Sequence, residues 1–409
     1  MKRKLFILGM TAIFILTLLP TAAFAYDSGV ETYNDHDYNA MLNFLNQPSA
    51  VKGQTNAQRL GYDITQPGMW ADVVWSDDTE KRLVQIGLEN EESYWRDKSL
   101  AGPLDLSDCT ALQMLKCACN PLTALDVSGC TSLQNLWCYS NQLTTLDVST
   151  NKELKTLLCS NNELTELDLS ENKALQGLYC YNVQMTSLDV RKNAALRSLH
   201  CKNNQLTVLD VSKNTALESL DCSLNQLTTL DLSKCTRLRT LYCNDNQLTT
   251  IEIGTCTAFQ QFWCYSNQLT KLDMSANKEL EQLLCSSNQL TTLDVSGCAS
   301  LHRLSCGLNQ LTSLDVSGCT GLRDLTCDYN QLTELDVSRC TALEYLSCTK
   351  NRMSTFIIFK ELKYLYCDES VSVMRLSAVL ICSGLVLLIV GTAALILVRR
   401  RRKKRAHHE

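Results

Sequence analysis

One stretch of sequence decides the fold: Leu133-Gln-Asn-Leu136-Trp-Cys138-Tyr-Ser-Asn141-Gln-Leu143-Thr-Thr-Leu146-Asp147-Val148-Ser149. This stretch is one unit of a repeat, and Cys138 has an equivalent in every unit. An asparagine follows that cysteine by three residues in each unit, from Asn120 to Asn351, except at Val183. A fixed period of this length is typical of a solenoid, whose coils cannot bury their apolar faces alone and must stack. The pattern returns every 21 residues, and its cysteine keeps register a dozen times, at Cys117, Cys138, Cys159, Cys180, Cys201, Cys222, Cys243, Cys264, Cys285, Cys306, Cys327 and Cys348.

The first half of each unit predicts a short strand followed by a turn. Leu136 and Cys138 alternate with the period of a strand, so we expect both to point inward and Trp137 and Tyr139 to point outward. Asn141 stands where the chain must turn. Its amide can satisfy backbone groups and stack on the asparagine of the next coil, which predicts an internal ladder.

The second half of the unit repeats this arrangement, as in Leu143-x-x-Leu146-x-Val148-x-x-Asn151, so each unit consists of two nested half-repeats. Its ladder position predicts a second buried column. That position holds cysteine at 109, 130, 235, 256, 298, 319 and 340, and asparagine at 151, 172, 193, 214 and 277.

The pattern Leu-x-x-Leu-x-Cys-x-x-Asn-x-Leu, which runs through residues 104–351, is the leucine-rich-repeat consensus. It resembles the bacterial 21-residue repeat of the IRREKO type, and the cysteine column is similar to that of the cysteine-ladder internalins of Gram-positive surfaces. The resemblance implies a parallel strand on the cysteine side and a second short extended segment on the Asp-Val-Ser side. We therefore expect a mostly β solenoid of about 13 coils.

Residues 26–103 precede the regular coils and predict a small α+β cap with a first irregular coil, because a bare solenoid end needs cover. Asp35 or Asp37 is expected to cap a short helix. We expect Trp70 and Trp75 to fill the core of the cap rather than to form a binding patch. The order of helix, tryptophan motif and strand resembles plant-type leucine-rich-repeat caps, although their cysteine pair is absent from this segment.

The two ends of the chain predict secretion and membrane anchoring. Residues 1–25 have the basic start, apolar run and Ala-x-Ala site of a signal peptide. After the solenoid, 104–367, and a short linker, 368–375, residues 376–398 carry no charge and are long enough to span a bilayer as a helix. The basic tail, 399–409, should stay cytoplasmic. We expect a single-pass type I protein of the bacterial cell membrane with an extracellular ectodomain.

Charge and motif content exclude several classes of function. The ectodomain, residues 26–374, holds 27 basic and 42 acidic residues, which argues against nucleic acid and other polyanions as partners. The chain shows no glycine-rich phosphate loop, His-Glu-x-x-His or Gly-x-Ser-x-Gly motif. We therefore expect neither an enzyme nor a cofactor.

The 22 cysteines invite a disulfide or metal interpretation. Thiols stacked in register on parallel strands point the same way rather than at one another, which favours buried free thiols. Zinc needs ligands that converge, and a linear ladder does not converge, so we expect no metal there. The aspartate column that includes Asp147 could be a calcium rail, but we favour hydrogen bonds to neighbours such as Thr144 and Ser149.

The outward residues beside the cysteine column vary from coil to coil, whereas the Leu-Thr-x-Leu-Asp-Val-Ser face is nearly constant. Tryptophan and tyrosine dominate binding hot spots, although they also fill exposed strand positions without any ligand. A structural envelope spacer without a specific ligand is the alternative. We predict that a protein or glycan outside the cell binds the strand face through Trp137, Tyr139, Tyr179, Tyr181, His200, Lys202, Tyr242, Trp263 and Tyr265.

Overall fold

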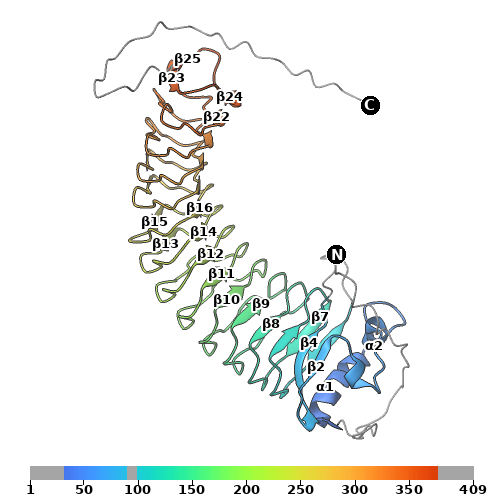
Figure 1. Ribbon diagram of the computed structural model, residues 1–409. Helices are drawn as coiled ribbons and strands as arrows, with labels where there is room; N and C mark the ends of the chain where they lie inside the picture. Colours follow the sequence, from blue (N-terminus) through green and yellow to red (C-terminus); the bar gives the residue numbers. More distant parts are fainter. Residues whose placement is uncertain (1–31, 90–98, 376–409) are drawn as a thin grey trace, which may run out of the picture. The chain divides into compact units, whose positions relative to one another are not determined.

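The computed structural model describes residues 32–89 and 99–375, which divide into two compact units (Figure 1). The first unit ends at Leu238 and also includes residues 252–254; the second takes in residues 239–251 and the chain from Thr255 on. Within the described ranges no helix is long and apolar enough to cross a membrane. The predicted signal peptide, membrane helix and basic tail all lie outside these ranges.

The first unit is built on one sheet whose strands follow each other in chain order. An antiparallel strand, β2 (Val73–Trp75), pairs with the outer edge of β4 (Leu83–Gly87), and the pairing has a bulge between Val74 and Trp75. From β6 (Met114–Lys116) onward, each strand pairs in parallel with the strand one repeat later, so that Leu136 lies beside Leu157. The parallel strands are β4 (Leu83–Gly87), β6 (Met114–Lys116), β8 (Asn135–Trp137), β9 (Thr156–Leu158), β10 (Gly177–Tyr179), β11 (Ser198–His200) and β12 (Ser219–Asp221).

The second unit continues the same construction with its own run of parallel strands. Its last coil is shorter by two residues, yet Leu365 still pairs with Leu346 in register. The strands are β14 (Thr240–Tyr242), β16 (Gln261–Trp263), β18 (Gln282–Leu284), β20 (Arg303–Ser305), β21 (Asp324–Thr326), β22 (Tyr345–Ser347) and β24 (Tyr364–Tyr366).

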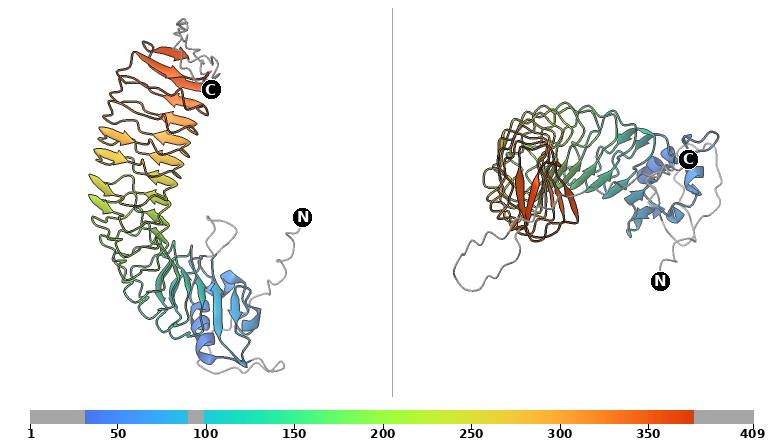
Figure 2. Two further views of the ribbon diagram at one scale, coloured as in Figure 1. Left: turned by 60° about the vertical axis from the view of Figure 1, so that its left-hand side comes forward. Right: turned by 90° about the horizontal axis from the view of Figure 1, so that it is seen from above.

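A second set of short strands lies on another side of the coils, as the family resemblance implies (Figure 2). Here β5 (Gly102–Asp105) pairs with β7 (Leu122–Asp126), and β17 (Lys271–Asp273) pairs with β19 (Thr292–Asp294). At the end of the described chain β23 (Thr355–Ile358) pairs with β25 (Ser372–Arg375). The stretch 368–375, expected to be a linker, thus contributes a strand to the solenoid. The set also includes β13 (Thr229–Asp231) and β15 (Thr250–Glu252).

The N-terminal cap contains β1 (Thr32–Tyr33), α1 (Asp35–Leu45), α2 (Asn56–Leu60), a 3-10 turn (Pro67–Met69) and β3 (Glu80–Lys81). The prediction that Asp35 or Asp37 caps the first helix is wrong. Asn34 is the cap, and its Oδ1 accepts the backbone N–H of Asp37. The Asp37 carboxylate is unavailable because it turns inward and accepts hydrogen bonds from Arg82 and from the backbone N–H of Leu83.

Trp70 fills the core of the cap, which confirms the structural interpretation of this residue. Its side chain is only 2% exposed. The ring stacks on Tyr38 and Tyr62 at centroid distances of 6.0 and 5.8 Å, and its Nε1 donates to the carbonyl of Asp63. Trp75 packs beside it at the cap's edge, half-buried, with a ring separation of 6.1 Å.

The predicted asparagine ladder is present, but it forms through the backbone rather than by amide stacking. In its coil Asn141 donates from Nδ2 to the carbonyls of Cys138 and Cys117, each at 3.0 Å, and its Oδ1 accepts the N–H of Leu122. One side chain therefore closes its own turn and joins two coils. Where Val183 replaces the asparagine, the next residue, Gln184, takes a left-handed φ of 60° that other coils lack at this place.

All 21 cysteines of the described ranges are thiols rather than disulfides, and all but Cys119 and Cys367 are buried. In the second column the Cys130 Sγ donates to the carbonyl of Leu106, 24 residues earlier. Asn151 makes the equivalent bond from Nδ2 to the carbonyl of Val127. Cysteine and asparagine therefore exchange at this position because each can donate to the same carbonyl of the preceding coil.

Candidate ligand-binding surface

The residue before each ladder cysteine points outward, and in-register pairing aligns these residues in one row across the first unit. Three predicted site residues, Trp137, Tyr179 and His200, belong to this row. The prediction left out three other members, although they occupy the same sequence column. In order along the sheet the row contains Lys116, Trp137, Leu158, Tyr179, His200 and Asp221.

Neighbours in this row pack on one another, so the predicted aromatic residues are half-buried rather than fully outward. Tyr179 and His200 stack at a centroid distance of 4.7 Å with an interplanar angle of 10°. The Lys116 Nζ lies 4.4 Å from the ring centre of Trp137. Strand spacing explains this packing, because rings on adjacent parallel strands in register fall within contact distance.

The row changes in charge along its length. Lys116 places a cation at one end, 3.4 Å from the Glu89 carboxylate, and Asp221 places a carboxylate at the other. Burial lowers the pKa of His200, and the nearby Asp221 opposes this effect in part. The imidazole is therefore neutral near pH 7 and presents an aromatic face with one ring nitrogen 3.5 Å from the Ser219 Oγ.

The residues that follow the ladder cysteines form a second row beside the first. Tyr139 and Tyr181 are half-buried, and Lys202 is exposed. An amide chain borders this row, because Asn182 donates to Asn161 at 2.7 Å and Asn203 donates to Asn182 at 2.6 Å. The first unit thus brings six predicted site residues onto one face: Trp137, Tyr139, Tyr179, Tyr181, His200 and Lys202.

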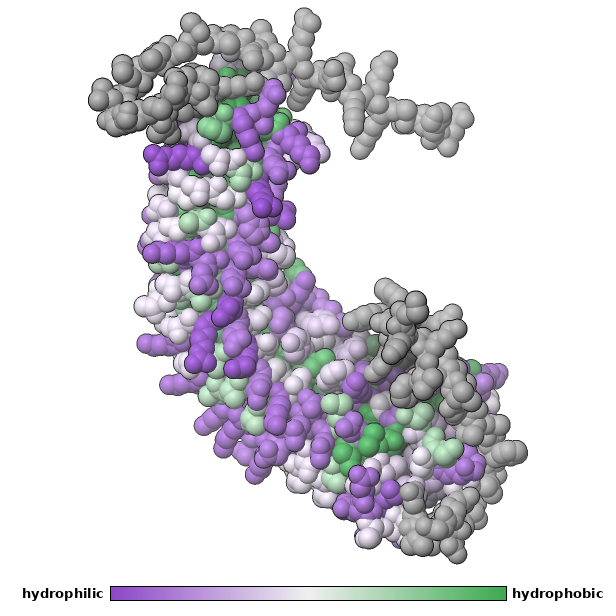
Figure 3. Space-filling model, viewed as in Figure 1, coloured by the Kyte–Doolittle hydropathy of each residue, from purple (hydrophilic) through white to green (hydrophobic). Residues whose placement is uncertain are grey.

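The second unit holds the other three predicted residues on adjacent strands. The rings of Tyr242 and Trp263 contact each other at a centroid distance of 4.3 Å. The Tyr242 hydroxyl donates to the Gln261 side chain, and Tyr265 is half-buried beside them. In the view of Figure 3 the upper coils show hydrophilic and intermediate side chains, with strongly hydrophobic residues only in small patches.

Sequence reasoning missed a further aromatic cluster in the last coils of the second unit. Tyr345 lies 6.3 Å from Tyr364 and 5.6 Å from Tyr366 between ring centroids, and the last two are about half exposed. Tyr345 and Tyr364 each stand three residues before the ladder cysteine of their coil. Tyr366 stands directly before its cysteine, as Trp263 does. Extending the same column rule to the end of the repeats would have found them.

Two exposed apolar side chains were also missed because their backbone conformation is unexpected. Leu308 and Tyr329 are 53% and 54% exposed and have φ values of 55° and 54°. They occupy the position before the ladder asparagine, which is left-handed in every regular coil, as at Ser140. Asparagine, aspartate or glycine tolerates this conformation best, so leucine and tyrosine are costly choices there.

The aspartate column of the constant face has a structural role that the sequence predicts in part. The Asp147 Oδ1 accepts the backbone N–H of Ser149 at 2.8 Å, and hydrogen bonds from Ser149 lower the pKa of this carboxyl. The expected bond to Thr144 is not among its contacts in the described residues. The same Asp-to-Ser turn recurs at Asp126, Asp168, Asp210, Asp231, Asp273, Asp294, Asp315 and Asp336.

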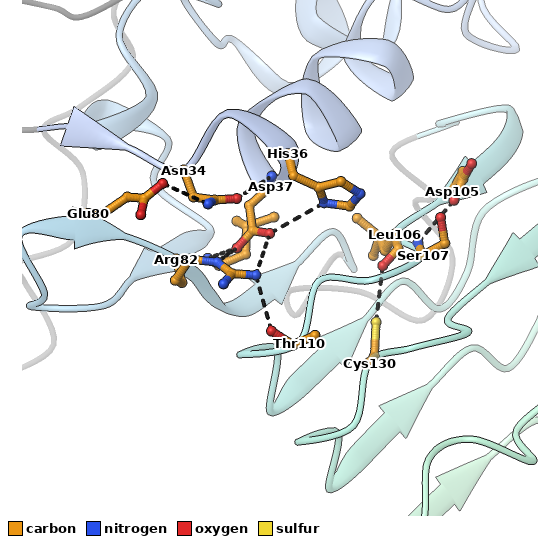
Figure 4. A network of polar contacts seen from close by, with 11 residues as sticks. Asn34, His36, Asp37, Glu80, Arg82, Asp105, Leu106, Ser107, Thr110 and Cys130 are labelled. Carbon is orange, nitrogen blue, oxygen red and sulfur yellow. Dashed lines mark hydrogen bonds and ion pairs between the residues drawn. The ribbon is translucent and has the colours of Figure 1, made fainter. Parts of the chain in front are cut away.

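A polar network joins the cap to the first coils (Figure 4). The buried Asp37 carboxylate accepts two hydrogen bonds from Arg82, whose guanidinium also donates to Thr110. His36 lies against the same carboxylate, with its Nδ1 3.6 Å from Oδ1. A pocket of about 240 Å³ opens beside this network, lined by His36, Asn39, Ala40, Asn43, Asp105 and Ser107.

Stacked parallel strands with cysteine and asparagine ladders define the chain as a leucine-rich-repeat solenoid protein, and solved structures carry the same fold. The functional domain of InlJ from Listeria monocytogenes, which includes a cysteine ladder, is 37% identical with a TM-score of 0.61. That similarity covers 67% of this chain and 61% of that one, so the chain spans less than two thirds of the internalin domain.

Two further bacterial structures are similar. A leucine-rich-repeat protein from Leptospira interrogans is 26% identical with a TM-score of 0.58, over 68% of this chain and 78% of that one. YopM from Yersinia enterocolitica is 25% identical with a TM-score of 0.53, over 65% and 60%. No family model and no curated protein matches the chain.

Proposed function

We propose that the chain is a cell-surface recognition or adhesion protein of the 21-residue repeat type, which binds a protein partner through its strand face and has no catalytic role. The observation that carries this proposal is the contrast between the two faces. Asp147 and its equivalents on the constant face are occupied with turns of the fold itself. The strand face instead carries aromatic rings that differ from coil to coil.

The chemistry of the strand face supports a protein ligand. Rings such as Trp137 and Tyr179 are held by cross-strand packing, so little side-chain freedom is left to lose on binding. The flanking charges of Lys116, Lys202 and Asp221 can set the orientation of a partner. A face of this kind offers large apolar contacts with a polar border, which is typical of protein interfaces.

The proposed topology places this face outside the cell. The signal peptide, the apolar stretch at 376–398 and the basic tail predict a type I membrane protein whose repeats are extracellular. Proteinase treatment of intact cells should then digest the repeats and spare a tag at Glu409. Protection of the repeats would contradict the topology without touching the binding proposal.

Binding itself is tested with the whole chain against arrays of extracellular proteins and of glycans. A small set of saturable protein partners is the expected result. Exclusive binding to glycans would change the ligand class. No binding on either array would favour the alternative function, a structural spacer of the envelope without a specific ligand.

A further inference from the structure

Three side chains of different chemistry meet where the cap joins the first coil. His36 and Asp37 lie in the first turn of α1, and Cys109 is the first cysteine of the second column. One nitrogen, one carboxylate oxygen and the sulfur all lie within 4.8 Å of one another. This is the one such group of three among residues 32–89 and 99–375. His36 and Asp37 are neighbours, but Cys109 lies far along the chain from both, so no motif spacing indicates the group.

The ligand types fit a tetrahedral zinc ion, and so does the spacing of two of the three ligand atoms. Zinc binds imidazole nitrogen, thiolate sulfur and carboxylate oxygen at about 2.0–2.3 Å, so neighbouring ligand atoms around it lie roughly 3.3–3.8 Å apart. The Nδ1 of His36 is already 3.6 Å from Oδ1 of Asp37. The side chain of His36 is half exposed, so it can turn to shorten its remaining distance to the sulfur.

The existing partners of Asp37 leave one oxygen suited to the metal. Oδ2 accepts the Nε of Arg82 and the backbone N–H of Leu83, both at 2.8 Å. Oδ1 accepts the longer bond from Arg82, at 3.1 Å, and faces His36. A ligating carboxylate whose other oxygen is held by hydrogen bonds is the usual arrangement around protein-bound metals, because those bonds fix its orientation. Arg82 would supply such an orienting hydrogen bond to Asp37.

The pocket beside His36 provides the remaining requirements of a site. It is lined by Asp105 and Ser107 and opens to solvent, so an ion can enter from it and a water can take the fourth position. Three protein ligands with one open position are a common zinc arrangement. The ladders themselves do not converge, whereas Cys109 lies within 4.8 Å of a nitrogen and a carboxylate oxygen of the cap helix.

We propose that His36, Asp37 and Cys109 bind a zinc ion that fastens the cap helix to the first coil. The ion would join α1 to the loop after β5, which Arg82 already links to Asp37 through its hydrogen bond to Thr110. The site is separate from the strand face, so it stands or fails independently of the ligand-binding proposal.

Cobalt(II) titration of the whole, reduced chain tests the proposal, because thiolate ligation produces a near-ultraviolet charge-transfer band and a tetrahedral site gives strong visible bands. We expect both bands at one equivalent of cobalt and their loss on adding zinc. His36→Ala and Cys109→Ala should each weaken zinc binding at least tenfold, and Cys109→Ala should abolish the thiolate band. His407 and His408 near the C-terminus can bind cobalt but cannot give that band.

The matched control is Cys130→Ala, which removes the next thiol of the same column, a donor to the Leu106 carbonyl. This variant should keep both bands and the full zinc affinity. Because His36 is half exposed, His36→Ala keeps the fold even if Cys109→Ala does not. Absence of the thiolate band in the unaltered chain, or unchanged zinc affinity in His36→Ala, would overturn the proposal.

Discussion

At the scale of single residues, the ladders are decided by which side chains can bond to backbone groups inside the stack. Asn225 shows the full requirement, since its Oδ1 accepts the N–H of Leu206 while its Nδ2 donates to the carbonyls of Cys201 and Cys222. No apolar side chain can replace these bonds. A shortened side chain would leave several buried backbone groups without a hydrogen-bond partner. Burying a polar group without a partner costs folding free energy.

Asn225→Ala should therefore destabilise the protein by about 2–4 kcal/mol, the combined cost of buried groups left unsatisfied. Urea unfolding followed by circular dichroism measures this loss. Gln226→Ala is the control, because its side chain is exposed one residue further on. Equal unfolding midpoints for the two variants would show that the ladder amide is dispensable.

The cysteine columns predict a particular dependence of stability on pH. Burial raises the pKa of the Cys159 and Cys264 thiols to about 12, from an ordinary value of 9.0. The folded state therefore keeps its protons where the unfolded chain loses them. The stability contributed by these thiols is complete below pH 9 and declines as pH rises from 9 towards 12.

Unfolding free energies measured between pH 8 and about 10.5 should fall with rising pH, and the fall should be shallower in Cys159→Ala, which lacks one such thiol. Alkylation of the folded protein at pH 8.5 should modify Cys119 and Cys367 but not the buried columns. Rapid modification of Cys159 before unfolding would contradict the burial of this thiol.

At the scale of elements, the cap depends on one buried ion pair. The side chain of Asp37 is 0% exposed and that of Arg82 is 27% exposed, and two hydrogen bonds join them. In zinc-free protein, Arg82→Met would leave a buried carboxylate without its cation, which typically costs about 3–5 kcal/mol. We expect the cap to lose protection first, with rapid hydrogen exchange across α1 measured by mass spectrometry.

A comparable pair on the surface provides the control for this prediction. Arg191 also makes two hydrogen bonds to one carboxylate, that of Asp189, but both side chains are more than half exposed. Arg191→Met should leave exchange and stability unchanged, because solvent screens an exposed pair. Similar effects from the two substitutions would mean that burial does not determine the strength of the cap pair.

The sequence predicted the coils well and the cap only in part, for a physical reason. Strand and turn follow from local alternation, as in Leu136 and Cys138, and in-register stacking follows from the constant period. The role of Asp37 depends on Arg82, 45 residues away, so a local capping rule assigned it wrongly and passed over Asn34. The half-burial of the strand-face rings was missed for the same reason, since it arises from packing between coils.

At the scale of the whole molecule, a constant frame carries a variable surface. The leucines, cysteines and asparagines repeat because every coil needs the same interior, whereas the strand face is free to change. The rings there also pack on their neighbours, as Tyr242 does on Trp263. Removing one such ring should cost about 1 kcal/mol of stability, so binding assays must use temperatures well below the unfolding transition.

The measurement that tests this account most directly compares two four-site variants for binding to a partner found on the protein array. The strand-face variant carries alanine at Trp137, Tyr139, Trp263 and Tyr265, and the matched control carries alanine at Thr145, Thr229, Thr250 and Lys271, all exposed on the constant face. We predict that the strand-face variant loses at least about 2 kcal/mol of binding free energy while the control binds as the unaltered chain does. Full binding by the strand-face variant together with loss of binding by the control would contradict the account and would place the ligand on the constant face.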